Sequence, residues 1–253
     1  YWGLYNLQER IDQGLIAQNF GVKEEDVIVF KNGNVIGADD MYYSLYLDVI
    51  HYASENDLSK PEHYRKIEEM IDIQSYIDYY CFQIYVANCD SVSNNYSCWR
   101  TLSISDEEYY DGKWRWILYD TDDSMGMVED LAEAETDSFR EGHWTNAPMD
   151  DVLFSSLMRN REFEQRFVDT FVEMADTVFA YEYVNQLIDE FCMNYKEASV
   201  LSRQRFRGME ETEEKYLEDV EVIRDFFKRR RTFIMGHMED ALEITLDDVD
   251  EKE

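Results

Sequence analysis

A polar stretch at residues 88–126 carries the side chains best suited to chemistry. Asp90 and Asn95 are separated by four residues, and Asp120 and Asp122 follow after two short apolar runs. In phosphoryl transfer, an aspartate accepts the proton of the attacking hydroxyl, while an asparagine and a second aspartate hold divalent ions against the nucleotide phosphates. Oxygen ligands of this kind suit Mg²⁺ or Mn²⁺ rather than zinc. The pattern therefore predicts a metal-dependent nucleotide site.

The same residues also have an ordinary structural interpretation. Asp and Asn are common in turns and at helix N-termini, so Asp90, Asn94 and Asn95 could be caps, and Asp120 and Asp122 could lie in an acidic loop. The spacing alone favours this interpretation. The surrounding elements and a family resemblance are needed to decide.

The residues before the polar stretch would place it at the end of a core helix. Residues 73–88 carry aromatic and aliphatic side chains nearly all round, which is typical of a helix buried on most sides. Asp72 or Ser75 would be its N-cap. Because this helix leads directly to Asp90, the polar loop is expected to start from the core rather than from a mobile tip.

Two apolar runs between the acidic loops predict a β-hairpin. Its strands are expected at residues 96–102 and 114–119, with Asp111-Gly112 as the turn in a long polar connection. A catalytic loop, a hairpin and then a metal-binding aspartate is also the order found in protein kinases.

The first 40 residues have the pattern of a small β-rich lobe. An apolar, aromatic opening predicts a strand, and a helical periodicity that includes Leu7 and Ile11 follows. A β-branched run and an Asn-Gly turn then predict a short hairpin within residues 27–36. Because the opening strand has no preceding partner in the chain, the lobe is expected to be truncated.

The remainder of the chain predicts a mainly helical lobe. An acidic segment at residues 127–147 is expected to be a surface loop or lid. The predicted fold class is α+β, with a small-lobe remnant at 1–40, a helical lobe with the active-site loops at 41–245 and an acidic tail at 246–253. Helices are expected at about 39–58, 61–70, 73–88, 149–159, 161–177, 182–197 and 211–237.

The charge balance limits the classes of partner. With 24 Lys and Arg against 56 Asp and Glu, the net charge is −32, which makes nucleic acid and anionic membrane surfaces unfavourable partners. A phosphorylated ligand would need a divalent cation or a local basic cluster. No apolar run approaches the length of a membrane span. The four cysteines are too scattered for a disulfide framework, and buried free thiols are expected.

Several short segments occur in the order found in a known family. They are YWGLYNLQERID, Asn88-Cys89-Asp90 with Asn95, KWRWILYDTDDSMG, NAPMDDVLFSSLMRNREFEQRF and FFKRRRTFIMGHM. In these segments the chain resembles the spore-coat CotH kinase family, a divergent protein-kinase-like fold. The resemblance implies ATP-dependent phosphorylation of Ser or Thr in exported or coat proteins with Mg²⁺ or Mn²⁺. It also implies a location outside the cell or at the cell or spore surface.

Transferred by position, the resemblance implies distinct roles within the polar stretch. Asp90 would be the catalytic base, Asn95 a metal ligand and Asp120 the principal metal ligand, while Asp122 would be a second ligand or an orienting group. The family's acidic loop reads close to WDLDxxxG. Tyr119 stands here in place of the tryptophan, and both acids are retained.

The small lobe would supply the groups that hold the nucleotide from the other side. Lys31 and Glu9 are the candidates for the phosphate-binding lysine and its glutamate, although a lysine beside Asn-Gly is commonly a solvated turn residue. No glycine-rich phosphate loop of the P-loop or GxGxxG kind is present in the sequence, which departs from ordinary kinases.

Several other residues invite a functional interpretation, but structural roles are expected for them. The tryptophans of the predicted hairpin should be core residues, two adjacent tyrosines should anchor a loop, and a basic run in the last helix should form salt bridges, with a phosphate-facing role as the alternative. His143 and Trp144 lie in the predicted lid. The other residues concerned are Trp99, Trp114, Trp116, Tyr109, Tyr110 and Arg229 to Arg231.

Two further functions remain open from the sequence. One is a catalytically inactive pseudokinase-type module that binds a partner or a glycan at the cell surface, which the aromatic content and missing glycine-rich loop favour. The other is a metal-dependent phosphoester hydrolase, which the scarcity of histidines disfavours, since the chain has four.

Overall fold

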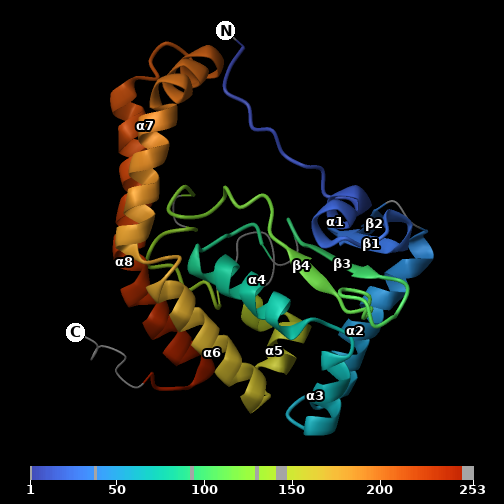
Figure 1. The fold of residues 1–253 in the computed structure, drawn as a ribbon. Coiled ribbons are helices and arrows are strands. Elements are labelled where there is room, and N and C mark those ends of the chain that lie inside the picture. The colour runs from blue at the N-terminus through green and yellow to red at the C-terminus, as the bar shows by residue number, and fades with distance from the viewer. Residues whose placement is uncertain (1, 37–38, 92–93, 129–130, 141–146, 247–253) are drawn as a thin grey trace.

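The computed structural model shows an α+β fold in which one antiparallel sheet packs against a larger helical body (Figure 1). It describes residues 2–36, 39–91, 94–128, 131–140 and 147–246. The strands are β1 (Val27–Lys31), β2 (Asn34–Ile36), β3 (Ser97–Thr101) and β4 (Arg115–Ile117). The helices are α1 (Gln13–Phe20), α2 (Tyr43–Glu55), α3 (Pro61–Glu68), α4 (Ile73–Tyr85), α5 (Val152–Leu157), α6 (Arg161–Asp176), α7 (Tyr181–Phe206) and α8 (Glu213–Leu242). Short 3₁₀ turns occupy Glu24–Asp26, Asp40–Tyr42 and Pro148–Asp150.

The sheet joins the two hairpins that the sequence predicts. Its strand order is β2-β1-β3-β4, so β1 of the N-terminal hairpin pairs antiparallel with β3 of the central hairpin. Side chains alternate between the two faces: Phe30 and Cys98 belong to the large core, whereas Val29 and Trp99 belong to a smaller cluster with Ile16 of α1. The proposed division of the chain at residue 40 remains a prediction, although the sheet is continuous across it.

Helix α4 lies at the centre of the large core. Nine of its 13 residues are buried, which confirms the core helix expected from its apolar composition. Asp72 is its N-cap, because the side chain accepts a hydrogen bond from the Ser75 backbone N–H at 3.1 Å. Aromatic rings fix its position. Tyr80 stacks on Phe154 of α5 with ring centroids 4.7 Å apart.

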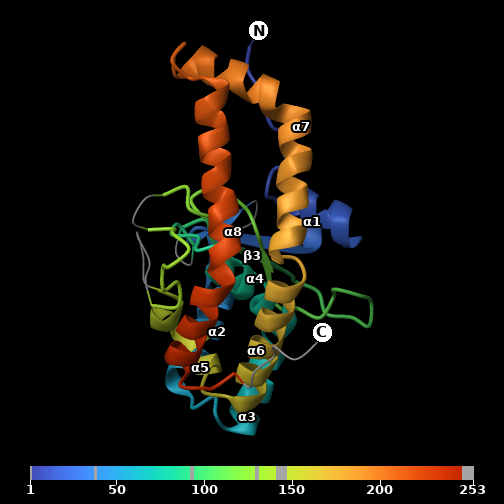
Figure 2. The same cartoon turned by 90° about the vertical axis from the view of Figure 1, so that its left-hand side faces the viewer.

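Helices α7 and α8 form a long antiparallel hairpin that extends well beyond the core (Figures 1 and 2). Both are longer than predicted, since the sequence indicated ends near residues 197 and 237. The outer turns lack a buried stripe, with Phe206 62% exposed, so apolar periodicity could not mark their extent.

The predicted opening strand is wrong. Residues 2–10 contain no regular element, and Leu7 is fully exposed. Leu4 instead donates its backbone N–H to the Ser202 hydroxyl at 3.1 Å, far along the α7 helix. The helical pattern also begins later than Leu7, because Asp12 caps α1 through the Gly14 N–H at 3.0 Å.

Among the residues that the structure describes, the segment 127–147 is an irregular loop, as predicted, but the prediction that it lies at the surface is wrong for several of them. Ala132 and Phe139 are both 0% exposed, so this segment packs into the core without forming a helix or strand. Its acidic composition concealed these apolar anchors. His143 and Trp144 lie outside the described residues. Within the described part of the chain, no helix is long and apolar enough to cross a membrane.

Candidate active site

The candidate catalytic loop leaves the end of α4 in a tightly bonded turn. The Asn88 backbone N–H donates to the Gln83 carbonyl at 3.0 Å, and the Asn88 side-chain amide donates to the Gln83 side-chain oxygen at 2.8 Å. Asn88 Oδ1 then accepts the Asp90 backbone N–H at 3.0 Å. Asp90 is 8% exposed, so the core helix holds this carboxylate on a rigid support, as the sequence predicts.

Two asparagines hold the Asp90 carboxylate. Asn94 Nδ2 lies 2.7 Å from Oδ1 and 2.8 Å from Oδ2, and Asn95 Nδ2 lies 2.7 Å from Oδ2. The Asn95 amide also reaches the Asp120 backbone carbonyl at 3.4 Å. The four-residue spacing thus brings Asp90 and Asn95 into direct contact and connects both to the second acidic loop. Asn94 had been interpreted from sequence only as a possible cap.

Backbone hydrogen bonds fasten the second acidic loop to the first. The Cys89 N–H donates to the Asp123 carbonyl at 3.1 Å, and the Met125 N–H donates to the Val86 carbonyl at 2.9 Å. Asp120 has φ 53°, a left-handed conformation that is uncommon for a residue other than glycine. Sparsely populated backbone conformations of this kind are concentrated at functional sites.

Four of the proposed site residues interact electrostatically. Loss of solvent around its carboxyl raises the pKa of Asp120, and the negative charges of Asp122 and Asp90 raise it further, whereas Lys31 lowers it. A cation beside Asp120 would relieve this repulsion. The structure therefore brings together Asp90, Asn95, Asp120, Asp122 and Lys31.

Lys31 reaches the site from the end of β1. Its ammonium nitrogen lies 4.4 Å from the centre of the Tyr119 ring, directly beside Asp120 in sequence. The tyrosine that replaces the family's tryptophan therefore still presents an aromatic face here. Glu9 lies apart on the exposed segment before α1, and no described hydrogen bond or ion pair joins it to these residues. Its assignment remains a prediction.

Asn32 connects the end of β1 to Tyr96 and Tyr119, which follow and precede the two polar loops, a role that sequence reasoning missed. Its side-chain oxygen accepts the Tyr96 backbone N–H at 2.9 Å and the Tyr119 hydroxyl at 2.8 Å. Its own N–H donates to the Tyr96 carbonyl at 2.9 Å. The available signal was the Lys-Asn-Gly turn, since an asparagine can occupy the left-handed conformation seen here, with φ 48°.

The donor set suits a hard divalent cation, although protein groups alone do not complete a site. Among the residues that the structure describes, no three acidic, histidine or cysteine side chains converge as metal ligands. Asp120 and Asp122 offer carboxylates, and Asn95 can offer its amide oxygen because its nitrogen donates to Asp90. Nucleotide-bridging Mg²⁺ commonly takes one or two carboxylates and completes its shell with phosphate and water.

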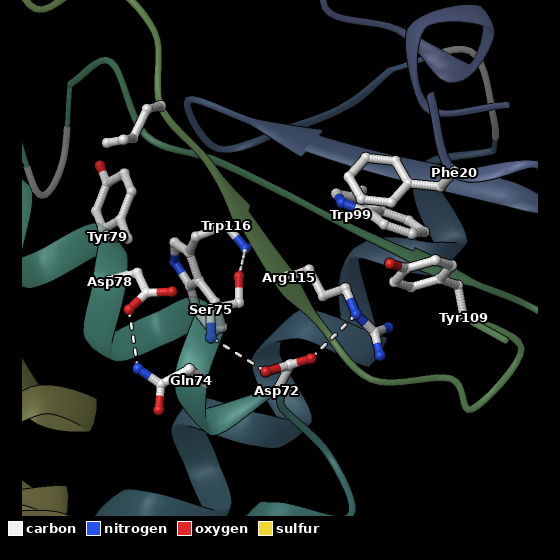
Figure 3. A pocket seen from close by; sticks show the side chains of 11 residues that line it. Phe20, Asp72, Gln74, Ser75, Asp78, Tyr79, Trp99, Tyr109, Arg115 and Trp116 are labelled. Atoms are coloured by element: carbon white, nitrogen blue, oxygen red, sulfur yellow. Dashed lines mark hydrogen bonds and ion pairs between the residues drawn. The ribbon is translucent and has the colours of Figure 1, made fainter. Parts of the chain in front are cut away.

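The β3–β4 hairpin is anchored to the start of α4 (Figure 3). Arg115 pairs with Asp72 at 3.2 Å, and the Trp116 N–H donates to the Ser75 hydroxyl at 2.8 Å. These groups border a cavity of about 380 Å³ that Phe20, Trp99 and Tyr109 also line. The Arg115 guanidinium lies over the Trp99 ring, 5.6 Å from its centre. We therefore assign the residues around this cavity a structural role, which is to hold the hairpin against α4.

The structural roles expected for other residues are largely confirmed. Trp99, Trp114 and Trp116 are buried, and the hydroxyl of buried Tyr110 accepts the Lys23 N–H at 2.8 Å. All four cysteines are free thiols, and three of them are buried. In the basic run, Arg229 and Arg231 form ion pairs as expected. Arg230 differs, because it is fully buried and donates to backbone carbonyls.

In a comparison with known protein families, the CotH kinase protein family matches residues 1–234 of the chain. The chain belongs to the CotH kinase protein family. The match covers the sheet, both acidic loops and most of α8. No curated protein matches the chain. Membership of the CotH kinase family indicates a kinase-like function, and it confirms the resemblance drawn from the sequence.

Proposed function

We propose that this CotH family member is an ATP-dependent protein kinase that uses Mg²⁺ or Mn²⁺ and phosphorylates Ser or Thr of exported or coat proteins. The observation that carries the proposal is the hydrogen-bonded chain from Asp90 through Asn95 to Asp120. It joins the buried Asp90 carboxylate to the Asn95 amide and to the backbone carbonyl of Asp120, so the three residues proposed for phosphoryl transfer lie next to one another.

Asp90 is the proposed general base. Asn94 and Asn95 fix its carboxylate through three contacts of 2.7–2.8 Å, so its orientation is set before substrate binds. A carboxylate has about four acceptor positions, which leaves capacity for the Ser or Thr hydroxyl of the substrate. Asp90 would orient this hydroxyl and accept its proton.

Asp120, Asp122 and Asn95 are the proposed metal-binding residues, and Lys31 is the proposed phosphate-binding residue. When bound, the metal ions neutralise phosphate charge and align the nucleotide for transfer. The mutual repulsion that raises the pKa of Asp120 favours a bound cation. The Lys31 ammonium lies over the Tyr119 ring, interacts electrostatically with Asp120 and carries the positive charge that a phosphate would approach.

The test is transfer of labelled phosphate from ATP with Mn²⁺ to candidate exported proteins. Replacing Asp90→Asn should lower the rate by at least about 100-fold, because general-base catalysis contributes about 10²–10⁴. Asp106→Asn, in the exposed loop between β3 and β4, is the matched control and should retain the wild-type rate. In a parallel experiment, the Asp120→Ala variant should bind Mg²⁺-nucleotide more weakly than the wild type, as measured by calorimetry. Full activity in Asp90→Asn, or unchanged affinity in Asp120→Ala, would contradict the assignment.

The alternative, an inactive binding module, has two observations in its favour. Both Asp90 oxygens already accept asparagine amides, and the Lys31 ammonium faces an aromatic ring. Such a module would show no phosphate transfer. It would also show no rise in melting temperature with Mn²⁺ and ATP, whereas a ligand that binds the native state raises it.

A further inference from the structure

A second polar cavity lies at the opposite end of the molecule from the tip of the α7–α8 hairpin. It is formed where α3 and α6 begin, near the bottom of Figures 1 and 2. Its volume is about 590 Å³, and its lining includes Tyr64, Arg65, Arg159 and Arg161. None of the residues assigned to the kinase site contributes to it.

The three arginines of this cavity stand out because the protein carries 56 acidic residues. Elsewhere, arginines such as Arg115 and Arg224 each pair with two carboxylates. No described carboxylate lies within ion-pair distance of Arg65, Arg159 or Arg161. Arg159 donates to the Ser156 hydroxyl at 3.1 Å, and its guanidinium has further donors. Three positive groups around one cavity therefore retain donors for a ligand.

Two helix N-termini face the same cavity and add to its positive potential. Helix α3 begins at Pro61 and has no side-chain N-cap, whereas α6 is capped by Asn160, whose Oδ1 accepts the Glu162 and Phe163 N–H groups. Asn160 is 6% exposed and donates to the Leu58 carbonyl at 2.9 Å, which fixes the two helix starts to each other. The positive ends of helix dipoles favour anions, phosphate in particular.

A buried hydroxyl also lies in the wall of the cavity. Tyr64 is 2% exposed, and its hydroxyl makes no hydrogen bond of ordinary geometry with the described residues. Burial raises the pKa of this hydroxyl to about 12, while the nearby Arg166 guanidinium acts to lower it. Buried polar groups are normally satisfied, so an orphaned one commonly marks a place where a ligand or water binds. Glu68 and Glu162 are part of the lining too. Three arginines against two glutamates leave one net positive charge, so charge alone would hold simple monoanions poorly.

We propose that this cavity binds a phosphomonoester dianion, carried either by a phosphorylated peptide or by a small phosphorylated molecule. Planar guanidinium groups bind phosphate through paired hydrogen bonds, which gives selectivity that net charge does not. Arg65 approaches from α3, and Arg159 and Arg161 approach from the start of α6, so a phosphate between them is contacted from two elements. The proposal is independent of the kinase assignment, because no residue is shared.

The experiment measures binding of a fluorescent phosphoserine peptide, with neutral flanking residues, to the full chain. Its unphosphorylated form is compared, and inorganic phosphate and free phosphoserine are used as competitors. Binding of the phosphopeptide should weaken at least 10-fold in Arg65→Ala/Arg161→Ala. The matched control is Arg205→Ala/Arg207→Ala, which removes the same charge from the exposed tip of α7 and should leave affinity unchanged. Asp120→Ala should also bind normally, which separates this cavity from the kinase site.

Each outcome decides the proposal. Competition by free phosphoserine or inorganic phosphate shows that the phosphate group suffices, whereas resistance to both assigns the site to a phosphopeptide. Equal losses in the two double variants, equal binding of the unphosphorylated peptide or absence of phosphopeptide binding would overturn it. If the alanine variant does not fold, the variant Arg65→Lys/Arg161→Lys is used instead. It keeps both positive charges and removes the planar guanidinium groups that form paired hydrogen bonds with phosphate. It should still weaken binding several-fold.

Discussion

Asn32, Asn94 and Asn95 each place an amide against a group that the proposed reaction would use. Asn94 and Asn95 orient the Asp90 carboxylate, and Asn32 holds Tyr119 beside Asp120. Amides can do this without adding charge to a site that already contains repelling carboxylates. At the residue scale, precise placement in this acidic protein therefore depends on neutral side chains.

Asn32→Gly tests whether the position of Lys31 relative to Asp120 matters for turnover. Glycine keeps the left-handed backbone at φ 48° and removes the oxygen that accepts from Tyr96 and Tyr119. Loss of two hydrogen bonds of about 1 kcal/mol each should lower kcat/KM about 10-fold or more. The effect should appear chiefly in KM for ATP if Lys31 binds phosphate.

Asn34→Ala is the control for that experiment, because Asn34 begins β2 directly after the same turn and, among the described residues, its side-chain amide donates only to the Asn32 carbonyl, at 2.9 Å. Its kcat/KM should stay within about twofold of the wild-type value, since exposed changes of this kind usually cost less than about 0.5 kcal/mol. Equal losses in the two variants would show that general loosening of the turn, rather than the Asn32 oxygen, is responsible.

At the scale of elements, one buried arginine ties the end of the core helix α4 to the segment after the acidic loops. Arg230 of α8 is 0% exposed and donates to the carbonyls of Tyr85, Ala134 and Thr136 at 2.7–2.9 Å. Two more contacts reach the Ile84 carbonyl and the Ser138 hydroxyl. Burial lowers the pKa of Arg230 to about 9, which still leaves it charged at neutral pH. All five N–H donors are thus used within the protein.

Arg230→Met should destabilise the protein by about 4 kcal/mol, because it leaves several buried carbonyls without donors. Arg229→Met is the control, since its ion pairs with Asp225 and Glu135 are partly exposed to solvent and should each be worth less than about 1 kcal/mol. Urea unfolding measures both. Similar losses in the two variants would show that the buried contacts contribute no more than a surface ion pair.

Comparison of sequence and structure shows which elements periodicity can reveal. It predicted α4 and both hairpins well, because their apolar residues meet the core at regular intervals. Periodicity failed for residues 2–10, where apolar side chains are exposed. It also failed for the segment containing Ala132 and Phe139, because that segment is held by hydrogen bonds from Arg230, which is distant in sequence. Likewise, Asp90 and Asn95 could be found from their spacing, whereas Asn32 lies 64 residues from its partner Tyr96.

At the scale of the whole molecule, the net charge of −32 opposes the compact state. Thirteen ion pairs among the described residues offset part of this repulsion locally. Dissolved salt screens the remaining repulsion, because the Debye length falls from about 30 Å at an ionic strength of 0.01 M to about 10 Å at 0.1 M. Stability should therefore depend strongly on ionic strength.

The melting temperature should rise by about 5 °C between 10 and 150 mM NaCl, since about 2–4 °C corresponds to 1 kcal/mol for a chain of this size. Scanning calorimetry measures this rise, and sucrose at equal osmolality separates screening from solute exclusion. A flat or falling response would mean that the acidic groups are already neutralised locally.

Because Mn²⁺ also screens charge, the test of nucleotide binding needs constant ionic strength. Under that condition Asp120→Ala should keep the salt response, as it changes one of 56 acidic residues, and lose the stabilisation by Mn²⁺ with ATP.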